Sequence, residues 1–292
     1  MSETILRVDN FRNNLSLQPS VIDSGFSRIK SALVLFLYYF ATTFINLILT
    51  FAILIINEIL TLFYIIIDIE VIESLLMTLT YITTILCLIP FFIKIIGSDI
   101  KKIFKTPIKA ILIILILYLG VLTITNLYYE FIEPLLINIS VKLNIIDQSV
   151  VDSNLTSDNQ ASIEALYSHP IAMWILIPSV IFIGPLTEEM VFRKALFRIV
   201  NSKKNIINIL ISSLLFASIH VASGILLTAF TQILIDPKMA FQLIFLELIY
   251  SGGYFLAGLL LSTCYVLSGQ NLIVVFIIHL LNNLLATLQI IM

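Results

Sequence analysis

The sequence predicts an all-α membrane protein with seven or eight transmembrane helices. Hydrophobic residues make up 60% of the chain and charged residues only 12%, whereas a soluble domain carries about 25% charged residues. Long apolar runs recur along the whole chain, and the alternating pattern of a transmembrane β-barrel is absent. No basic stripe with interleaved aromatic residues is present, so the expected partner is a lipid bilayer and not a nucleic acid.

Seven apolar runs, each separated from the next by polar residues, are long enough to cross the membrane, for which about 20 residues suffice. They cover approximately residues 31–56, 75–96, 108–127, 170–193, 206–235, 239–267 and 272–292. A bend at Ser223-Gly224 or at Ser251-Gly253 would split the fifth or the sixth run and give eight spans.

The polar segments suggest three parts. Residues 1–30 lack the apolar stretch of a signal peptide and are expected to form a cytoplasmic tail. Residues 31–167 would hold the N-terminal membrane helices and an outer loop, and residues 168–292 a membrane core. Residues 57–74 are expected to form an acidic outer connection, and residues 130–169 the longest polar connection, with a flexible loop at 152–160.

The distribution of lysine and arginine predicts the orientation. Four lie in the tail, five follow the second run and five follow the fourth, which leaves only Lys142 and Lys238 for the opposite side. Cytoplasmic loops carry such an excess of positive charge. We therefore expect an integral membrane protein with a cytoplasmic N-terminus, in the cell membrane of a prokaryote.

Two carboxylates and a guanidinium lie where the surrounding sequence predicts membrane. Ionisable groups are costly in hydrocarbon and are usually functional. Glu189 and Arg193 are four residues apart and share a helix face, whereas Glu188 points about 100° away from Glu189. The spacing predicts that Arg193 holds Glu189 and leaves Glu188 available for chemistry, just after a kink or restart at Pro185.

Two further polar groups are predicted at a similar depth on other helices. Phe216 and His220 share a face of the fifth run, and His279 and Asn283 share a face of the last run. A single histidine or asparagine in a membrane helix is as well explained by packing against its neighbours. Three helices with polar groups at one depth favour a shared site. Glu247 is interpreted as structural or accessory, and His169 as an interfacial residue.

Hydrolysis by an activated water suits this set of side chains best. Glu188 with His220 would take a proton from water, and His279 with Asn283 would donate hydrogen bonds to the developing oxyanion. In a variant of this site, Glu188, His220 and His279 hold a zinc ion, since two histidines and one glutamate form a catalytic zinc set. The sequence has no His-Glu-x-x-His motif, so no motif signals a metal.

The motifs Glu188-Glu189-x-x-x-Arg193, Phe216-x-x-x-His220 and His279-x-x-x-Asn283 resemble the three-part signature of the CAAX-protease and bacteriocin-processing (CPBP, or Abi) family of intramembrane proteases. The resemblance implies that residues 168–292 form a catalytic membrane core with endopeptidase activity, either glutamate-dependent or metal-dependent. It implies a membrane-associated or prenylated peptide or protein as substrate. The alternative is a non-catalytic scaffold, immunity or regulatory protein that binds another membrane protein.

Overall fold

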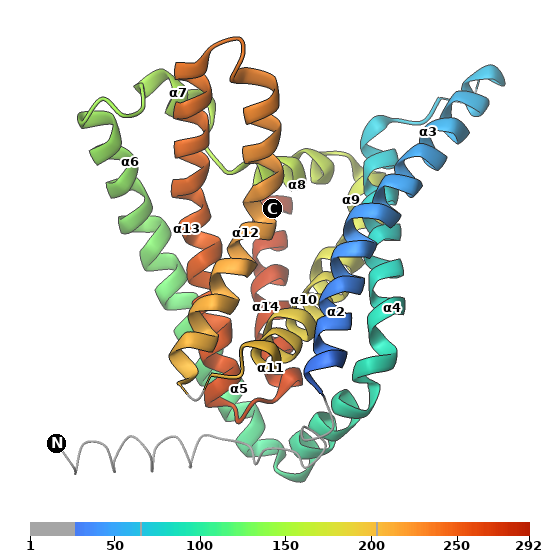
Figure 1. Ribbon diagram of the computed structural model, residues 1–292, viewed down its shortest axis with the longest axis vertical. Coiled ribbons are helices and arrows are strands. Elements are labelled where there is room, and N and C mark those ends of the chain that lie inside the picture. Colours follow the sequence, from blue (N-terminus) through green and yellow to red (C-terminus); the bar gives the residue numbers. More distant parts are fainter. Residues whose placement is uncertain (1–26, 65, 203) are drawn as a thin grey trace.

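The computed structural model describes residues 27–64, 66–202 and 204–292, and the regular structure in these ranges is entirely helical (Figure 1). Seven of the described helices are long and apolar enough to cross a membrane. The predicted class, an all-α membrane protein, is therefore confirmed. Of the predicted tail at residues 1–30, only 27–30 are described, and Arg28 already begins the first helix.

Several of the long helices are assembled from α-helical segments joined without a break by π-helical turns. In chain order the elements are α2 (Arg28–Phe40), η2 (Ala41–Ile45), α3 (Asn46–Leu62), α4 (Ile69–Lys105), α5 (Pro107–Leu127), η3 (Tyr128–Ile132), α6 (Glu133–Lys142), α7 (Gln148–Ser153), α8 (Asp158–Ser168), α9 (Pro170–Pro178), η4 (Ser179–Ile183), α10 (Gly184–Glu188), η5 (Glu189–Ala195), α11 (Leu196–Val200), α12 (Asn205–Gln232), α13 (Pro237–Leu267) and α14 (Leu272–Ile291).

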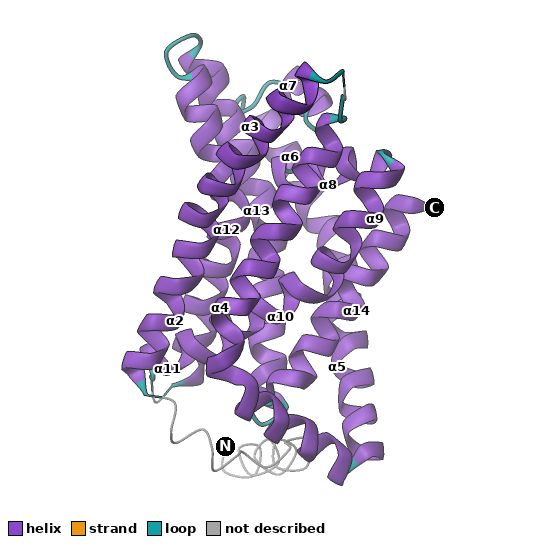
Figure 2. Cartoon of the chain, turned by 90° about the vertical axis from the view of Figure 1, so that its right-hand side faces the viewer, coloured by secondary structure: helices purple, strands orange, loops and turns teal. Residues whose placement is uncertain are grey.

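The long helices run up and down between two ends of the molecule (Figures 1 and 2). The start of α2 and the connections α4–α5, α11–α12 and α13–α14 lie at one end, at the bottom of Figure 1. The connections α3–α4 and α12–α13 and the short helices α7 and α8 lie toward the other end. The basic residues at the end of α4 and those of η5 and α11 thus share one end, which the positive-inside rule assigns to the cytosol. That assignment stays a prediction.

The acidic outer connection expected at residues 57–74 is wrong in extent. Helix α3 continues to Leu62, and α4 already begins at Ile69. The Thr61 hydroxyl donates a hydrogen bond of 2.9 Å to the carbonyl oxygen of Asn57 in the same helix, so the polar residues here extend the helix. Acidic residues favour the first turns of a helix because they face its positive end, and Glu70 lies in the first turn of α4.

The long connection expected at residues 130–169 is also shorter than predicted. The third membrane helix continues through η3 and α6 to Lys142, and the π-helical turn directly precedes the first turn of α6, which holds Pro134. The loop expected at 152–160 is present but shorter, since only residues 154–157 lie outside helices. Helix α7 ends at Ser153 and α8 begins at Asp158, where Ser157 caps the helix by accepting a hydrogen bond from the Gln160 N–H.

Neither α12 nor α13 is split, because the glycines that suggested a break are points of close approach. Gly252 and Gly253 of α13 face the phenol groups of Tyr128 and Tyr129 in η3. At Gly258 an added Cβ would lie 2.9 Å from the Cα of Ser213 in α12. Small residues allow two membrane helices to pack backbone to backbone. The close pair α12–α13 forms one side of the core that surrounds the acid-bearing helix.

A buried polar contact fixes the start of α14 against the end of α4. Asp99 is fully buried, and its carboxylate accepts hydrogen bonds from the Leu272 N–H at 2.9 Å and from Lys102 Nζ at 2.8 Å. Asn271 donates to the carbonyl oxygen of Asp99 and caps α14 by accepting from the N–H groups of Ile273 and Val274. Because α14 carries His279 and Asn283, this contact sets the height of both in the bundle.

We expect Asp99→Ala to lower the free energy of unfolding by about 1–3 kcal/mol, because it leaves the buried Leu272 N–H without its charged acceptor. The measurement is thermal unfolding in detergent. The matched control is Asp152→Ala, since Asp152 is exposed and its side chain accepts a hydrogen bond from the nearby Gln148 side chain; it should change stability by less than about 0.5 kcal/mol. Equal effects of the two substitutions would contradict the role given to Asp99.

Candidate active site

The predicted acid-bearing helix is one continuous rod with two π-helical turns. Residues Pro170–Val200 form a single membrane-spanning helix, and the turns η4 and η5 enclose the short segment α10. The predicted kink at Pro185 is therefore realised as a change in helical winding and not as a break. π-Helical turns inside α-helices occur frequently at functional sites. Glu188 ends α10 and Glu189 begins η5, so the two acids lie at the junction.

The ion pair predicted between Glu189 and Arg193 is present and fully buried. The distance between Arg193 Nε and Glu189 Oε2 is 3.0 Å, and both side chains have 0% exposure. The contact is poorly aligned for a hydrogen bond, so its attraction is mainly Coulombic. Arg193 also donates from Nη1 to the hydroxyl of Ser212 at 2.8 Å and lies over the Phe216 ring, 5.1 Å from its centroid. The guanidinium thus joins η5 to α12.

His279 lies between the two carboxylates. Its Nδ1 is 2.8 Å from Glu189 Oε1, and its Nε2 is 3.9 Å from Glu188 Oε2. Since the ionised Glu189 can only accept, Nδ1 carries the proton in the first contact. The second distance, between Nε2 and Glu188, is too long for a hydrogen bond. The Glu188 carboxylate, which is 7% exposed, is thus close to His279 Nε2 but not bonded to it. The chain Arg193–Glu189–His279 therefore orients the imidazole toward Glu188.

His220 is oriented by its own helix. Its Nδ1 lies 2.7 Å from the carbonyl oxygen of Phe216, one turn earlier in α12. A carbonyl only accepts, so Nδ1 is the donor, and in the neutral ring Nε2 then keeps its lone pair. The centroid of the His220 ring lies 4.6 Å from that of the Phe216 ring. The Phe216 centroid in turn lies 6.0 Å from that of the His279 ring. Glu188 acts electrostatically on His220. The structure thus brings Glu188, His220 and His279, from three helices, to one place.

Asn283 lies one turn beyond His279 and contacts the acid-bearing helix. Its Nδ2 donates to the carbonyl oxygen of Val180 in η4 at 3.0 Å. In a regular α-helix that carbonyl would bond to the N–H of the residue four positions later, and the π-helical winding changes this pattern. The amide carries two N–H donors, and the contact with Val180 uses one of them. Asn283 therefore links two helices and also retains a second donor.

Three tyrosines near the site were missed by the sequence reasoning. The buried phenol of Tyr38 in α2 and the partly buried phenol of Tyr81 in α4 are electrostatic neighbours of Glu188, and Tyr254 in α13 stacks on His220. Tyr81 also packs against Gly184, where an added Cβ would lie 3.2 Å from Tyr81 Cε1. Each comes from a helix without a motif, so no spacing in the sequence relates these residues to the acids.

The predicted zinc ligands are Glu188, His220 and His279. Within the part of the chain that the structure describes, no three His, Cys, Asp or Glu side chains are grouped as metal ligands. His220 and His279 turn their Nδ1 atoms to a backbone carbonyl and to Glu189, respectively. Metal-binding histidines are commonly oriented by such bonds, which leave Nε2 of each ring as the donor. Zinc binding by Glu188, His220 and His279 stays a prediction.

The two residues interpreted as accessory have structural partners. Glu247 Oε2 accepts from the backbone N–H of Asp158 at 3.2 Å and so holds the start of α8. His169 Nδ1 caps α9 by accepting from the Ala172 N–H, and its Nε2 lies 3.1 Å from Asp68 Oδ2. Neither residue contacts the motif residues through these bonds, and both stabilise the end of the bundle away from the basic connections.

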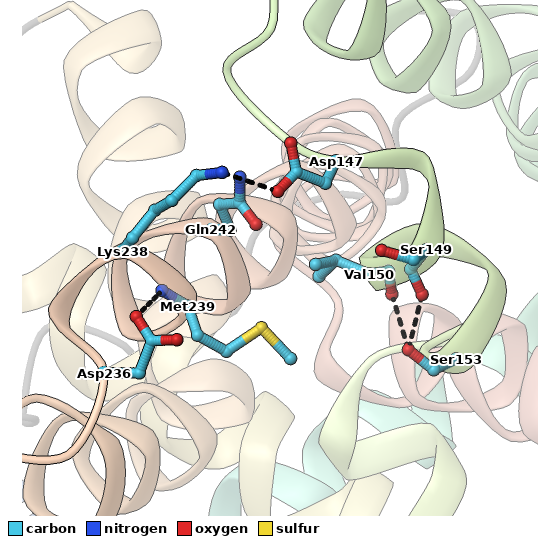
Figure 3. Close-up of a pocket in the computed structure, with 8 residues that line it drawn as sticks. All are labelled: Asp147, Ser149, Val150, Ser153, Asp236, Lys238, Met239 and Gln242. Atoms are coloured by element: carbon cyan, nitrogen blue, oxygen red, sulfur yellow. Dashed lines mark hydrogen bonds and ion pairs between the residues drawn. The ribbon is translucent and has the colours of Figure 1, made fainter.

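A surface cavity of about 330 Å³ lies between α7 and the start of α13, at the same end of the bundle (Figure 3). Lys238 Nζ contacts Asp147 Oδ2 at 2.8 Å, and hydrogen bonds from Lys238 and Gln242 lower the pKa of Asp147. No motif residue lines this cavity. It belongs to the attachment of the outer connection to α13 and not to the candidate active site.

Comparison with known proteins agrees with the motifs. A family model described as type II CAAX prenyl endopeptidase Rce1-like matches residues 170–285. The predicted resemblance to the CAAX proteases is thereby confirmed over that segment, which contains all three motifs. No curated protein and no solved structure matches the chain.

Proposed function

Because residues 170–285 match the family model of the Rce1-like CAAX prenyl endopeptidases, we propose that this chain is an intramembrane endopeptidase that cleaves its substrate with a water molecule activated by Glu188 and His220. The family supports a CAAX-type protease in general. The residue roles, the substrate and the side of cleavage are our proposal.

The observation that carries the proposal is the arrangement around Glu188. Glu189 is held by Arg193 and by His279 Nδ1, whereas His279 Nε2 lies 3.9 Å from Glu188 Oε2, beyond hydrogen-bond distance. Of the two adjacent carboxylates, Glu189 is thus held by structural contacts, and Glu188 remains able to bind a water molecule. A scaffold has no physical need for such a buried set, since ionisable groups are costly in the membrane.

The proposed reaction uses ordinary hydrolytic steps. Glu188 takes one proton from water, and His220 Nε2 accepts a hydrogen bond from the other O–H group and so orients the molecule. The water oxygen bonds to the scissile carbonyl carbon, and the carbonyl oxygen becomes an oxyanion. The carbon–nitrogen bond then breaks, and Glu188 passes its proton to the leaving amine. The products are a free amine and a carboxylic acid, which releases its remaining proton to solvent and becomes a carboxylate.

His279 and Asn283 would stabilise the oxyanion. In this role His279 is the imidazolium, with one ring N–H bonded to Glu189 and the other directed at the developing charge. The second N–H of the Asn283 amide supplies another donor, while the first stays on Val180. Donors fixed in this way need no rearrangement during the reaction, which is the condition for effective oxyanion stabilisation.

The substrate is proposed to reach the site from the cytosolic side. Glu188 precedes the end of its helix at Val200 by 12 residues, or roughly 18 Å at 1.5 Å per residue, and that end lies with the basic connections. A peptide held at the membrane, by a prenyl group or by its own apolar segment, fits this location. Both classes share an extended chain close to the cytosolic membrane surface.

Membrane proteomics tests the proposal. Cells with the wild type, with Glu188→Ala and with Glu247→Gln as a control would be compared for proteins that accumulate uncut. We expect accumulation only with Glu188→Ala, with cleavage sites on the cytosolic side. Cleavage sites on the outer side would overturn the predicted membrane orientation but would still support the proposed protease activity. No difference among the three strains would favour the scaffold alternative.

A further inference from the structure

The His220 imidazole contacts two aromatic rings. Tyr254 of α13 stacks on it with a centroid distance of 4.6 Å and an interplanar angle of 18°. Phe216 of its own helix lies at the same centroid distance with a tilt of 42°. Together with the hydrogen bond from Nδ1 to the Phe216 carbonyl, these contacts restrain both the plane of the ring and its rotation.

Tyr254 is itself held by the outer connection. Its hydroxyl accepts a hydrogen bond from Asn159 Nδ2 at 2.9 Å and lies 3.2 Å from the Ser157 hydroxyl. The same connection is attached to α13 twice more, by the bond from Asp158 to Glu247 and by the bond from the Tyr250 hydroxyl to the Asn154 carbonyl at 2.6 Å. The Tyr254 ring is thus anchored at its far end while its face contacts His220.

We propose that Tyr254 is a positioning residue, which holds the His220 imidazole with Nε2 turned toward the water-binding place beside Glu188. The inference rests on the proposed function for the use of this orientation, but the stacking itself is independent of it. Ser157 and Asn159 hold the far end of the Tyr254 ring, whereas the orientation of His220 depends on the stacked face of that ring.

The single bond from Nδ1 to the carbonyl leaves the imidazole plane free to swing about that contact. A flat ring stacked on the imidazole removes this freedom, because offset stacking favours near-parallel planes at this separation. A general base must hold its lone pair within hydrogen-bond reach of the water. Loss of the stack should therefore reduce the fraction of enzyme with His220 correctly oriented, without removing a substrate contact.

Nitrogen NMR of isotopically labelled histidine tests the positioning without any substrate. The chain has three histidines, so His220→Ala assigns the His220 signals. We expect one protonated and one unprotonated ring nitrogen in the wild type. In Tyr254→Leu the two signals should move toward an average, and in Tyr254→Phe, which keeps the ring, they should stay apart. Unchanged His220 signals in Tyr254→Leu would overturn the proposal.

Turnover of a farnesylated peptide with a CAAX terminus, in liposomes, tests the consequence. Tyr254→Leu should lower kcat by about 10- to 100-fold with little change in KM, since misplacement of a catalytic group of about 1 Å can cost this much. Tyr254→Phe should restore most of the rate. In the His220→Ala background Tyr254→Leu should have no further effect, because coupled residues are not additive.

Tyr250→Leu is the matched control. Tyr250 lies on the same helix, is buried and bonds to the same connection, but it does not stack on His220. It should lower thermal stability while leaving the His220 signals and kcat unchanged. Should Tyr254→Leu not fold, Tyr254→Met replaces it, since methionine fills irregular space without a ring.

The outcomes separate the two proposals. If His220→Ala remains active, the proposed function fails, and the NMR result still decides whether the stack orients the ring. If His220→Ala is inactive but Tyr254→Leu keeps the wild-type kcat, the positioning role fails and the proposed function stands. An equal loss from Tyr254→Leu with and without His220 would also overturn the positioning role.

Discussion

Glu188→Gln should lower kcat for peptide cleavage by about 100-fold or more while the protein folds normally, because general-base catalysis contributes about 10²–10⁴-fold. Glutamine has nearly the shape of glutamate but cannot take a proton from water. The carboxylate is 7% exposed and is not held by Arg193, so its replacement leaves the buried ion pair intact. The measurement is cleavage of a farnesylated peptide in liposomes, with mass-spectrometric detection, beside thermal unfolding.

Glu247→Gln provides the control, since Glu247 is another buried carboxylate with the same 7% exposure in the membrane bundle. Its bond to the Asp158 N–H can be kept by the glutamine oxygen, so both rate and stability should stay close to the wild type. A Glu188→Gln protein that cleaves at the wild-type rate would contradict the assignment of Glu188 as general base, whatever the result with Glu247.

Arg193→Met should be the most destabilising substitution in the site. It leaves the fully buried Glu189 carboxylate without its counter-ion and removes the bond to Ser212. Breaking a buried ion pair by removing one partner costs about 3–5 kcal/mol. We expect a clear fall in the unfolding temperature in detergent, together with a loss of activity, because Glu189 also orients His279.

The double variant Glu189→Leu/Arg193→Met separates structure from chemistry. Apolar residues of similar volume can replace a buried ion pair without loss of stability, so the double variant should unfold at a higher temperature than Arg193→Met alone. It should remain inactive, because His279 has lost its acceptor. If Arg193→Met unfolds like the wild type and still loses activity, Arg193 acts in the reaction itself and the structural role is wrong.

The sequence by itself determined the fold class, the approximate position of the seven spans and the residues worth testing. These features depend on local composition and helical spacing, which do not require knowledge of the neighbouring helices. An apolar run must form a helix in the membrane to satisfy its backbone, and residues four apart must share a face. The ion pair between Glu189 and Arg193 follows from the same geometry.

Only the tertiary structure decided how the three motif helices meet and what surrounds them. That His279 bonds to Glu189 and approaches Glu188, that Asn283 bonds to Val180, and that Tyr254 covers His220 are contacts between helices. Helix spacing predicts the face on which a residue lies but not which other helix covers that face. The polar residues at 57–62 and 130–142 were assigned to connections for a related reason. Beyond the apolar run, a helix can continue with its polar side chains returning hydrogen bonds to its own backbone, and composition alone does not distinguish this from a loop.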